Sequence, residues 1–209
     1  MRTHPSSEAG MTLIELIIGM MLMSIVITIF MSFFVSVQAN FGRQSDRSQS
    51  NDQVRLAVEE IDREVRSGNL LYDPALESDS LHDIYPGMSL RVYTQTNAPT
   101  RDPSNRCVQW RIKGGELSMR SWSVTWTVDG DVTDWRVIAD HVVNQSNNPQ
   151  VMAFTLDPET SKGGRTLNVN ILVNENVKSG RDVQVTSSVT GRNTEYGYPS
   201  DICNGIPPY

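Results

Sequence analysis

The uncharged stretch near the N-terminus is the feature that most constrains how this chain can fold. From Leu16 to Val37 the sequence has no Asp, Glu, Lys or Arg. A helix needs roughly 20 apolar residues to cross the hydrocarbon core of a bilayer, so this stretch is long enough to span a membrane. One carboxylate, Glu15, lies immediately before it. A carboxylate inside a membrane costs on the order of 2.5–3.5 kcal/mol on insertion scales, so Glu15 calls for a partner.

A secretory signal peptide and a plain membrane anchor are the two ordinary explanations of this stretch, and each accounts for only part of it. A secretory signal peptide has an apolar region of about 7–15 residues followed by an A-x-A-like cleavage site. The stretch here is longer, and residues 36–40 (SVQAN) make a weak site of that kind. A plain single-pass anchor explains the length but neither Gly10 nor Glu15. The bias of Arg and Lys across the stretch does not settle its orientation, because Arg2 precedes it while Arg43 follows it.

The residues around Gly10 carry a more specific pattern, G-MTLIE, which resembles the cleavage and methylation signal of type IV pilins and pseudopilins. The resemblance implies a leader of residues 1–10 that is removed by a prepilin peptidase after Gly10. It implies methylation of the new N-terminus at Met11, where the family more often has Phe. It also implies that Glu15 pairs with the amine of a neighbouring subunit during assembly. Ser32 stands where major pilins often carry a helix-kinking Pro, so a straighter helix is expected.

The apolar helix is expected to continue beyond the membrane. In residues 51–67 four aliphatic side chains recur at spacings of four, three and four, which is one stripe of a helix with 3.6 residues per turn. Glu59 and Arg63 form a supportive pair four residues apart, and Gly68 is a typical helix stop. We therefore expect a transmembrane and assembly helix over 11–40 and an amphipathic half over 41–67, with the polar stretch 42–52 the least certain part. The stripe consists of Val54, Val58, Ile61 and Val65.

The remaining residues, 68–209, are enough for one globular head and are expected to be rich in strands. The pair Gly114-Gly115 between two alternating segments predicts a hairpin, because tight hairpin turns need positive φ. Segments 123–128 and 135–143 are expected to form either a strand pair or a strand and a short helix. The predicted fold class is α+β, a long N-terminal helix packed on an antiparallel sheet. The other predicted strands cover 88–96, 107–113, 116–122, 151–156, 166–173 and 183–189.

Motifs in the head resemble a subclass of the same family. The order of these motifs resembles that of PilW-like minor pilins and of the J-type minor pseudopilins of type II secretion. The motifs are a strand with Trp110, then Leu117 and Arg120 after a turn, the segment 135–139 (WRVIA) and the segment 186–193 (TSSVTGRN). The two cysteines, Cys107 and Cys203, follow the membrane segment and would face an oxidising compartment, where a disulfide is favoured over two free thiols. Such a bond would tether the C-terminal tail and contribute roughly 4–5 kcal/mol in the chain-entropy model.

Catalytic motifs are not found, so an enzyme is not expected, and no cofactor is predicted. The three histidines are scattered in the sequence. The turn with Asp129, Asp131 and Asp134 is a weak calcium candidate, and a solvated turn is the favoured interpretation. The four tryptophans could line a binding face, but core and cross-strand packing is their commoner role. With 24 acidic and 18 basic residues and a net charge of −6, the chain offers no dedicated nucleic-acid site.

The resemblance implies a function in assembly. The expected protein is a minor pilin incorporated at or near the tip of a type IV pilus, where it initiates assembly or supports adhesion, motility or DNA uptake. Its expected partners are other pilins, a prepilin peptidase, an inner-membrane assembly platform and the membrane itself. The head would lie outside the cytoplasmic membrane and reach the cell surface after assembly. The alternatives are a minor pseudopilin of type II secretion and a membrane-anchored binding protein or adhesin.

Overall fold

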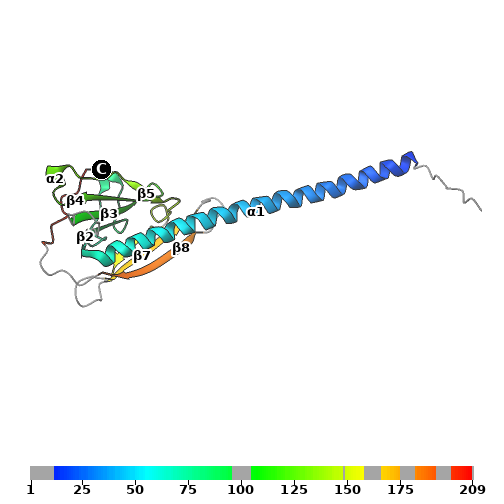
Figure 1. Ribbon diagram of the computed structural model, residues 1–209. Helices are drawn as coiled ribbons and strands as arrows, with labels where there is room; N and C mark the ends of the chain where they lie inside the picture. The colour runs from blue at the N-terminus through cyan, green and yellow to red at the C-terminus, as the bar shows by residue number, and fades with distance from the viewer. Residues whose placement is uncertain are drawn as a thin grey trace, which may run out of the picture. The chain divides into compact units, whose positions relative to one another are not determined.

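The computed structural model describes residues 12–95, 105–147, 149–157, 166–174, 182–191 and 199–208. The chain divides into two compact units between Ser45 and Asp46, and each is described here by itself (Figure 1). A single long helix, α1, occupies Leu13–Ser67 and contributes to both units. The remaining elements are β1 (Gly68–Leu71), η1 (Ser80–His82), β2 (Ser89–Gln95), β3 (Asn105–Lys113), β4 (Glu116–Ser123), α2 (Trp126–Asp129), β5 (Arg136–Ala139), β6 (Phe154–Leu156), β7 (Thr166–Val173) and β8 (Val183–Thr190).

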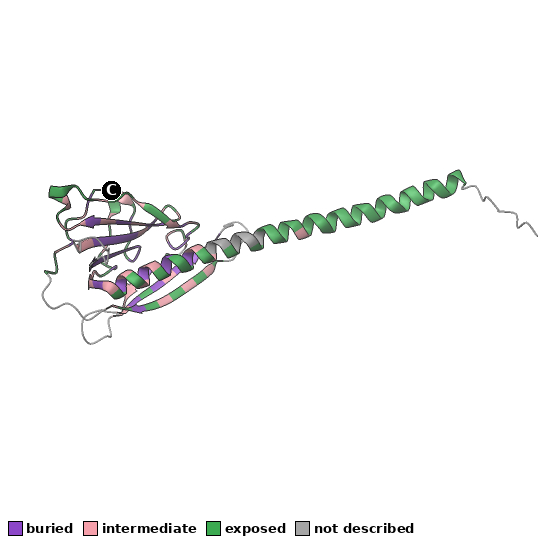
Figure 2. Cartoon of the chain, viewed as in Figure 1, coloured by how far each residue is buried: buried purple, intermediate pink, exposed green. Residues whose placement is uncertain are grey.

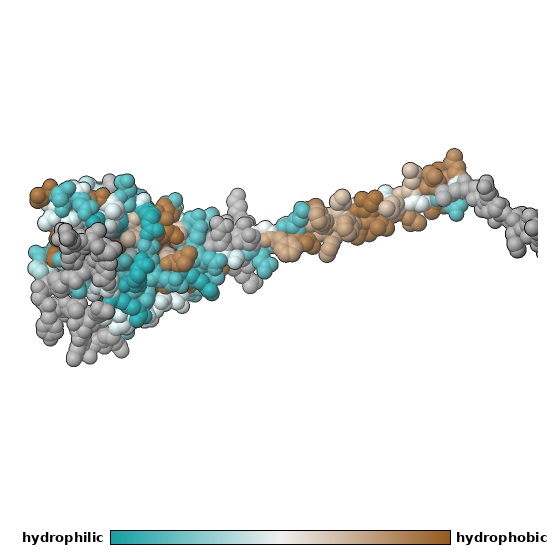
Figure 3. Space-filling view, viewed as in Figure 1, coloured by the Kyte–Doolittle hydropathy of each residue, from teal (hydrophilic) through white to brown (hydrophobic). Residues whose placement is uncertain are grey.

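The first unit is the apolar part of α1. Its aliphatic, methionine and phenylalanine side chains are exposed around the whole circumference of the helix, and Figure 3 shows hydrophobic colours along it. A helix that is apolar on every side has no single face to bury and is typical of a membrane span or a helix bundle. The polar stretch 42–52, the least certain part of the predicted helix, is helical throughout.

In the second unit, α1 is amphipathic and one stripe of it enters the core. The predicted stripe is confirmed, because Val54 and Ile61 are fully buried and Val58 and Val65 nearly so. Figure 2 shows this alternation of buried and exposed residues along the helix. The predicted ion pair of Glu59 with Arg63 is wrong: the Arg63 guanidinium lies 3.9 Å from the Glu60 carboxylate and 3.7 Å from that of Glu64. Both are surface contacts of small energetic value.

Helix α1 ends at Ser67, as Gly68 predicts, but the chain continues directly into a strand that the sequence did not reveal. Gly68 begins β1, which pairs antiparallel with β2. A Cβ atom on Gly68 would lie 2.5 Å from Cγ1 of Val92. The helix can therefore turn into the sheet at this point only because residue 68 has no side chain.

Five strands form the larger sheet in the order β1-β2-β3-β4-β5, and all its pairs are antiparallel. The β3–β4 hairpin turns at Gly114 and Gly115, whose φ angles are +60° and +86°, so the predicted hairpin is confirmed. The segment after β4 follows the second of the two expected arrangements. It forms the short helix α2, which ends at Gly130 with φ of +69°, and then the strand β5.

The remaining strands form a separate antiparallel sheet in the order β6-β7-β8, so the described strands of the head form two sheets rather than one. The inner faces of both sheets and the stripe of α1 share one hydrophobic core. Its largest fully buried side chains include Trp110, Phe154 and Ile61. The fold class is α+β, as predicted: a long N-terminal apolar helix followed by antiparallel sheet, consistent with the pilin fold.

Candidate functional site

The first candidate site is the start of α1. Gly10 and Met11, the predicted cleavage and methylation residues, lie outside the described residues. Thr12 precedes the first helical residue, and its hydroxyl oxygen accepts a hydrogen bond from the Glu15 backbone N–H at 3.4 Å. Thr12 thus has the position and contact of an N-cap, and T-x-x-E is the capping-box pattern. Glu15 is exposed in the first turn, where a carboxylate interacts favourably with the helix dipole.

The helix that follows is suited to an apolar environment. Residues Leu13–Gly42 have a mean hydropathy of 2.5 in their most apolar window, and in the described part of the chain this is the one helix with the length and composition of a membrane span. Its hydroxyl groups are satisfied within the helix. Ser24, Thr28 and Ser32 each donate to a backbone carbonyl one turn earlier, at 2.8 Å. These polar side chains therefore do not need water inside a bilayer or a bundle.

The second candidate site is the outer face of the five-stranded sheet, on the side away from α1. Side chains alternate across a sheet, and the strand register aligns the outward residues of β2, β3 and β4 in rows. One row is Arg91, Gln109 and Arg120, and the next is Tyr93, Cys107 and Trp122. All six side chains are buried, and residues 199–208 of the C-terminal tail contact this face. We call the contacts that hold this tail the C-terminal clamp.

A disulfide fixes one end of the clamp. Cys107, on the central strand β3, is bonded to Cys203, and their Cα atoms are 5.8 Å apart. This is the pairing that the sequence favours. The backbone of Cys203 is also held: its N–H donates to the Tyr72 hydroxyl at 3.0 Å, and its carbonyl accepts from Arg91 at 2.6 Å. Burial raises the pKa of Tyr72, which keeps its hydroxyl neutral.

Two further side chains hold the rest of the tail. The Arg120 guanidinium donates to the carbonyl oxygens of Pro207 at 2.9 Å and Pro208 at 3.1 Å. The indole N–H of Trp126 donates to the Gly205 carbonyl at 2.7 Å. Hydrogen bonds that involve a charged group contribute about 1.5–3 kcal/mol each. A tail held by several such bonds and a disulfide is a fixed part of the head.

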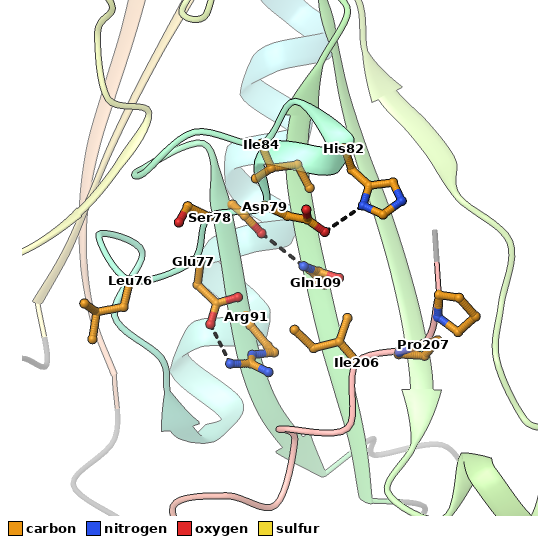
Figure 4. A pocket seen from close by; sticks show the side chains of 12 residues that line it. Leu76, Glu77, Ser78, Asp79, His82, Ile84, Arg91, Gln109, Ile206 and Pro207 are labelled. Atoms are coloured by element: carbon orange, nitrogen blue, oxygen red, sulfur yellow. Dashed lines mark hydrogen bonds and ion pairs between the residues drawn. The ribbon is translucent and has the colours of Figure 1, made fainter.

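A cleft of about 410 Å³ lies between the tail and the segment that joins β1 to β2 (Figure 4). Ser89 and Gln109 are among its lining residues, and each is only 1% exposed. The carboxylates on its wall are already paired: Glu77 with Arg91 at 2.5 Å and Asp79 with His82 at 2.6 Å. Burial raises the pKa of Glu77, although Arg91 acts in the opposite direction. The cleft therefore offers carboxylates that already have hydrogen-bond partners, and a polar floor.

The weak calcium candidate is a hydrogen-bonded turn. The carboxylate of Asp129 accepts from the hydroxyls of Ser123 and Thr125, and from the Asp131 N–H at 2.8 Å. That backbone hydrogen bond is the largest cause of the lowered pKa of Asp129. The Asp131 carboxylate binds both terminal nitrogens of the Arg106 guanidinium, while Asp134 is exposed. Among the described residues, no group of three His, Cys, Asp or Glu is placed to hold a metal ion.

The tryptophans and the remaining histidine have structural surroundings. Trp110 and Trp122 are fully buried. The ring of Trp135 lies 3.7 Å from the Arg111 guanidinium and 4.4 Å from that of Arg120, which are cation–π contacts. His141 is exposed with a φ of +57° and lies 3.0 Å from the Asp140 carboxylate. The sequence did not predict that Arg91, Arg120 and Tyr72 hold the tail, because their clamp partners lie up to 131 positions away.

These features are those of a protein with one described apolar helix long enough to span a membrane, followed by an α+β head consistent with the pilin fold. The comparison with known families agrees. The family model for the prokaryotic N-terminal methylation motif matches residues 5–31, which span the predicted cleavage site and most of the apolar stretch Leu16–Val37. No curated protein matches the chain. The motif supports the type IV pilin and pseudopilin family, with processing by a prepilin peptidase, and it indicates a structural subunit that associates with other pilins.

Proposed function

We propose that this protein is a minor subunit of a type IV pilus that is cut after Gly10, methylated at Met11 and incorporated at or near the filament tip. The observation that carries the proposal is the continuity of the methylation motif, residues 5–31, with the apolar helix Leu13–Gly42. One segment thus combines a processing signal with a helix suited first to lipid and then to a bundle of like helices. A plain membrane anchor would require the apolar helix but not the processing signal.

Glu15 has a specific role in this proposal. Because lipid is as apolar as a helix bundle, moving α1 from one to the other gains little from burial alone. Polar contacts then decide how neighbouring helices align. The Glu15 carboxylate would pair with the N-terminal amine of an adjacent subunit and set the axial register between the two helices. Cys107 and Cys203 would keep the exported head intact through the clamp.

Two substitutions test the proposal in the native host. Gly10→Val should block cleavage, so the intact mass keeps residues 1–10 and the first residue is not methylated. Glu15→Val should leave cleavage intact but reduce the amount of the subunit in sheared filaments. Glu15→Asp is the matched control, because it keeps the charge. Normal incorporation of Glu15→Val would contradict the role of Glu15, and an unprocessed wild-type chain would contradict the pilin assignment itself.

The second candidate is a minor pseudopilin of type II secretion, which the order of motifs in the head favours equally. Both systems would use the same N-terminal processing and the same helix. They differ in the phenotype of a deletion strain. Loss of surface filaments supports the pilus, whereas loss of secreted exoproteins with filaments retained supports the secretion system.

A further inference from the structure

Strand β8 has an unusual edge. Among the described strands, it is the outermost one of the sheet β6-β7-β8. Its sequence, VQVTSSVT, contains no charged residue and no proline. It pairs with β7 without a register shift from Val183, opposite Val173, to Thr190, opposite Thr166. A long, regular and uncharged strand at the edge of a sheet is a template for pairing with another chain.

The other outer strands are protected in the ways that usually prevent such pairing. β1 and β5 each have four residues, and both pair with their neighbours through a register shift. β5 also carries the charged Arg136. β6 has only three residues. Short strands, bulges and charges are the common devices against edge-to-edge association. β8 has none of them, so its edge differs from the rest of the head.

The hydrogen bonds of β7 reveal which groups of β8 face outward. Alternate residues of an antiparallel strand direct both N–H and C=O to the same neighbour. In β7, the Asn170 N–H donates to the Ala153 carbonyl, and the Leu172 carbonyl accepts from the Val143 N–H, both at 2.8 Å. Even-numbered residues of β7 therefore face away from β8, and odd-numbered residues face it.

The register pairs the odd-numbered residues of β7 with the odd-numbered residues of β8. The even-numbered residues of β8 consequently direct their N–H and C=O groups to the open edge, and their side chains are exposed as well. In the described parts of the chain, no backbone hydrogen bond involves these groups. They are Gln184, Thr186, Ser188 and Thr190.

A groove of about 550 Å³ lies beside this edge, between residues 183–187 of β8 and the amphipathic half of α1. Figure 1 shows β7 and β8 alongside that part of the helix. The helix contributes Val58 and two charges of opposite sign, Arg55 and Glu59. Four residues of helix rise about 6 Å, and two residues of an extended strand span about 6.7 Å. An acidic and a basic residue two positions apart on a strand would thus match these two charges.

We propose that the open edge of β8 and this groove bind an extended segment of a different polypeptide, which adds a fourth strand to the sheet. The segment has β-branched residues at alternate positions and an acidic and a basic residue two positions apart. Main-chain hydrogen bonds to the even-numbered residues of β8 hold it in place, and Arg55 and Glu59 select its charge pattern. The partner does not have to be a filament subunit, so this site is independent of the pilus assignment.

Amide hydrogen exchange on the full-length protein in detergent micelles provides the first test. In the free protein, the amides of Val183, Val185, Ser187 and Val189 should be protected, whereas those of the even-numbered residues should exchange quickly. Adding the synthetic peptide TVEVKVT should slow exchange at the even-numbered amides. A free protein in which both sets are already protected would overturn the proposal, because the edge would then be occupied within the chain. Failure of the peptide to protect the even-numbered amides would also overturn it.

A proline substitution can remove a hydrogen-bond donor from the open edge of β8 without disturbing the pairing of β8 with β7. Thr186→Pro removes an outward N–H and leaves the hydrogen bonds to β7 in place. It should weaken peptide binding about tenfold, the equivalent of one hydrogen bond and its unsatisfied partner. Thr186→Val, which keeps the N–H, is the matched control and should bind like the wild type. A peptide with N-methyl groups at alternate amides should fail to bind the unaltered protein. Because this control changes only the peptide, misfolding of a protein variant cannot explain the loss of binding. Equal binding by both variants overturns the proposal.

Charge selection gives an independent measurement. The wild type should bind TVEVKVT about two- to fivefold more tightly than TVKVKVT, as expected for exposed ion pairs. Arg55→Glu places two acidic residues on the groove and should reverse that order. An unchanged order would overturn the assigned charge pattern. If the protein instead forms dimers through β8 that Thr186→Pro abolishes, the edge binds a second copy of this chain and the proposed partner is wrong.

Discussion

Removing the disulfide should lower the free energy of unfolding of the head by an amount that depends on the length of the loop that the bond closes. Cys107 and Cys203 are separated by 96 positions. Closing a loop of this size restricts the unfolded chain and, in the chain-entropy model, stabilises the folded state by about 4–5 kcal/mol. Both cysteines are fully buried, so replacing them with alanine also removes the packing of two sulfur atoms. The double variant Cys107→Ala/Cys203→Ala should therefore lose somewhat more than reduced wild-type protein.

The folded state should survive this change, because the clamp has other contacts. Arg91, Arg120 and Trp126 still bind the tail carbonyls when the disulfide is absent. The cost should appear as a lower free energy of unfolding in urea, measured on the full chain in mild detergent through the fluorescence of the buried tryptophans. Reduced wild-type protein is the control that removes the bond but keeps both sulfur atoms. If reduction changes the free energy of unfolding by less than about 1 kcal/mol, the loop-closure reasoning is refuted.

Two further predictions concern the packing of α1 and the Asp129 turn. Ile61→Ala, at a fully buried position, should lower the free energy of unfolding by about 2–5 kcal/mol. Leu56→Ala, on the same helix but 65% exposed, should change it by less than about 0.5 kcal/mol. Similar losses in the two variants, measured by urea unfolding, would contradict the assigned stripe. The pKa of Asp129 is lower in the folded state than its ordinary value of 3.8, so its ionised form stabilises the head above that value, and this contribution disappears as the pH falls through the folded pKa. Asp129→Asn should flatten the acid side of a stability–pH profile, and an unchanged profile would disprove the role of this carboxylate.

The sequence predicts the parts of this fold that depend on local pattern. The stripe that contains Val54 and Ile61 is visible because a helix places residues three and four apart on one face. The β3–β4 hairpin is visible because only glycine readily adopts the φ angles found at Gly114 and Gly115. The segments 123–128 and 135–143 allowed two arrangements, because their residues and the turn between them fit both a strand pair and a strand with a short helix.

Features that depend on distant residues were not predictable in this way. β1 was missed because Gly68 correctly indicates the helix end but carries no signal for the strand that follows it. The division of the strands into two sheets depends on which strands lie next to each other, and strand length and alternation do not specify this. The contacts on the outer face of the larger sheet could not be predicted, because its arginines bind groups that are not near them in the sequence. The tail carbonyls that Arg91 and Arg120 bind are 87 to 112 positions away.

The clamp also imposes an order of events on the folding of the head. Strands β2 and β4 are synthesised long before the carbonyl groups that Arg91 and Arg120 bind. Until residues 199–208 reach the sheet, Arg91 and Arg120 have only part of their partners, Glu77 for the first and Gln109 for the second, and burying a cation that lacks hydrogen-bond partners is costly. Contacts between residues so far apart in sequence also form slowly. We therefore expect the docking of the tail on the outer face to be a late step in the folding of the head.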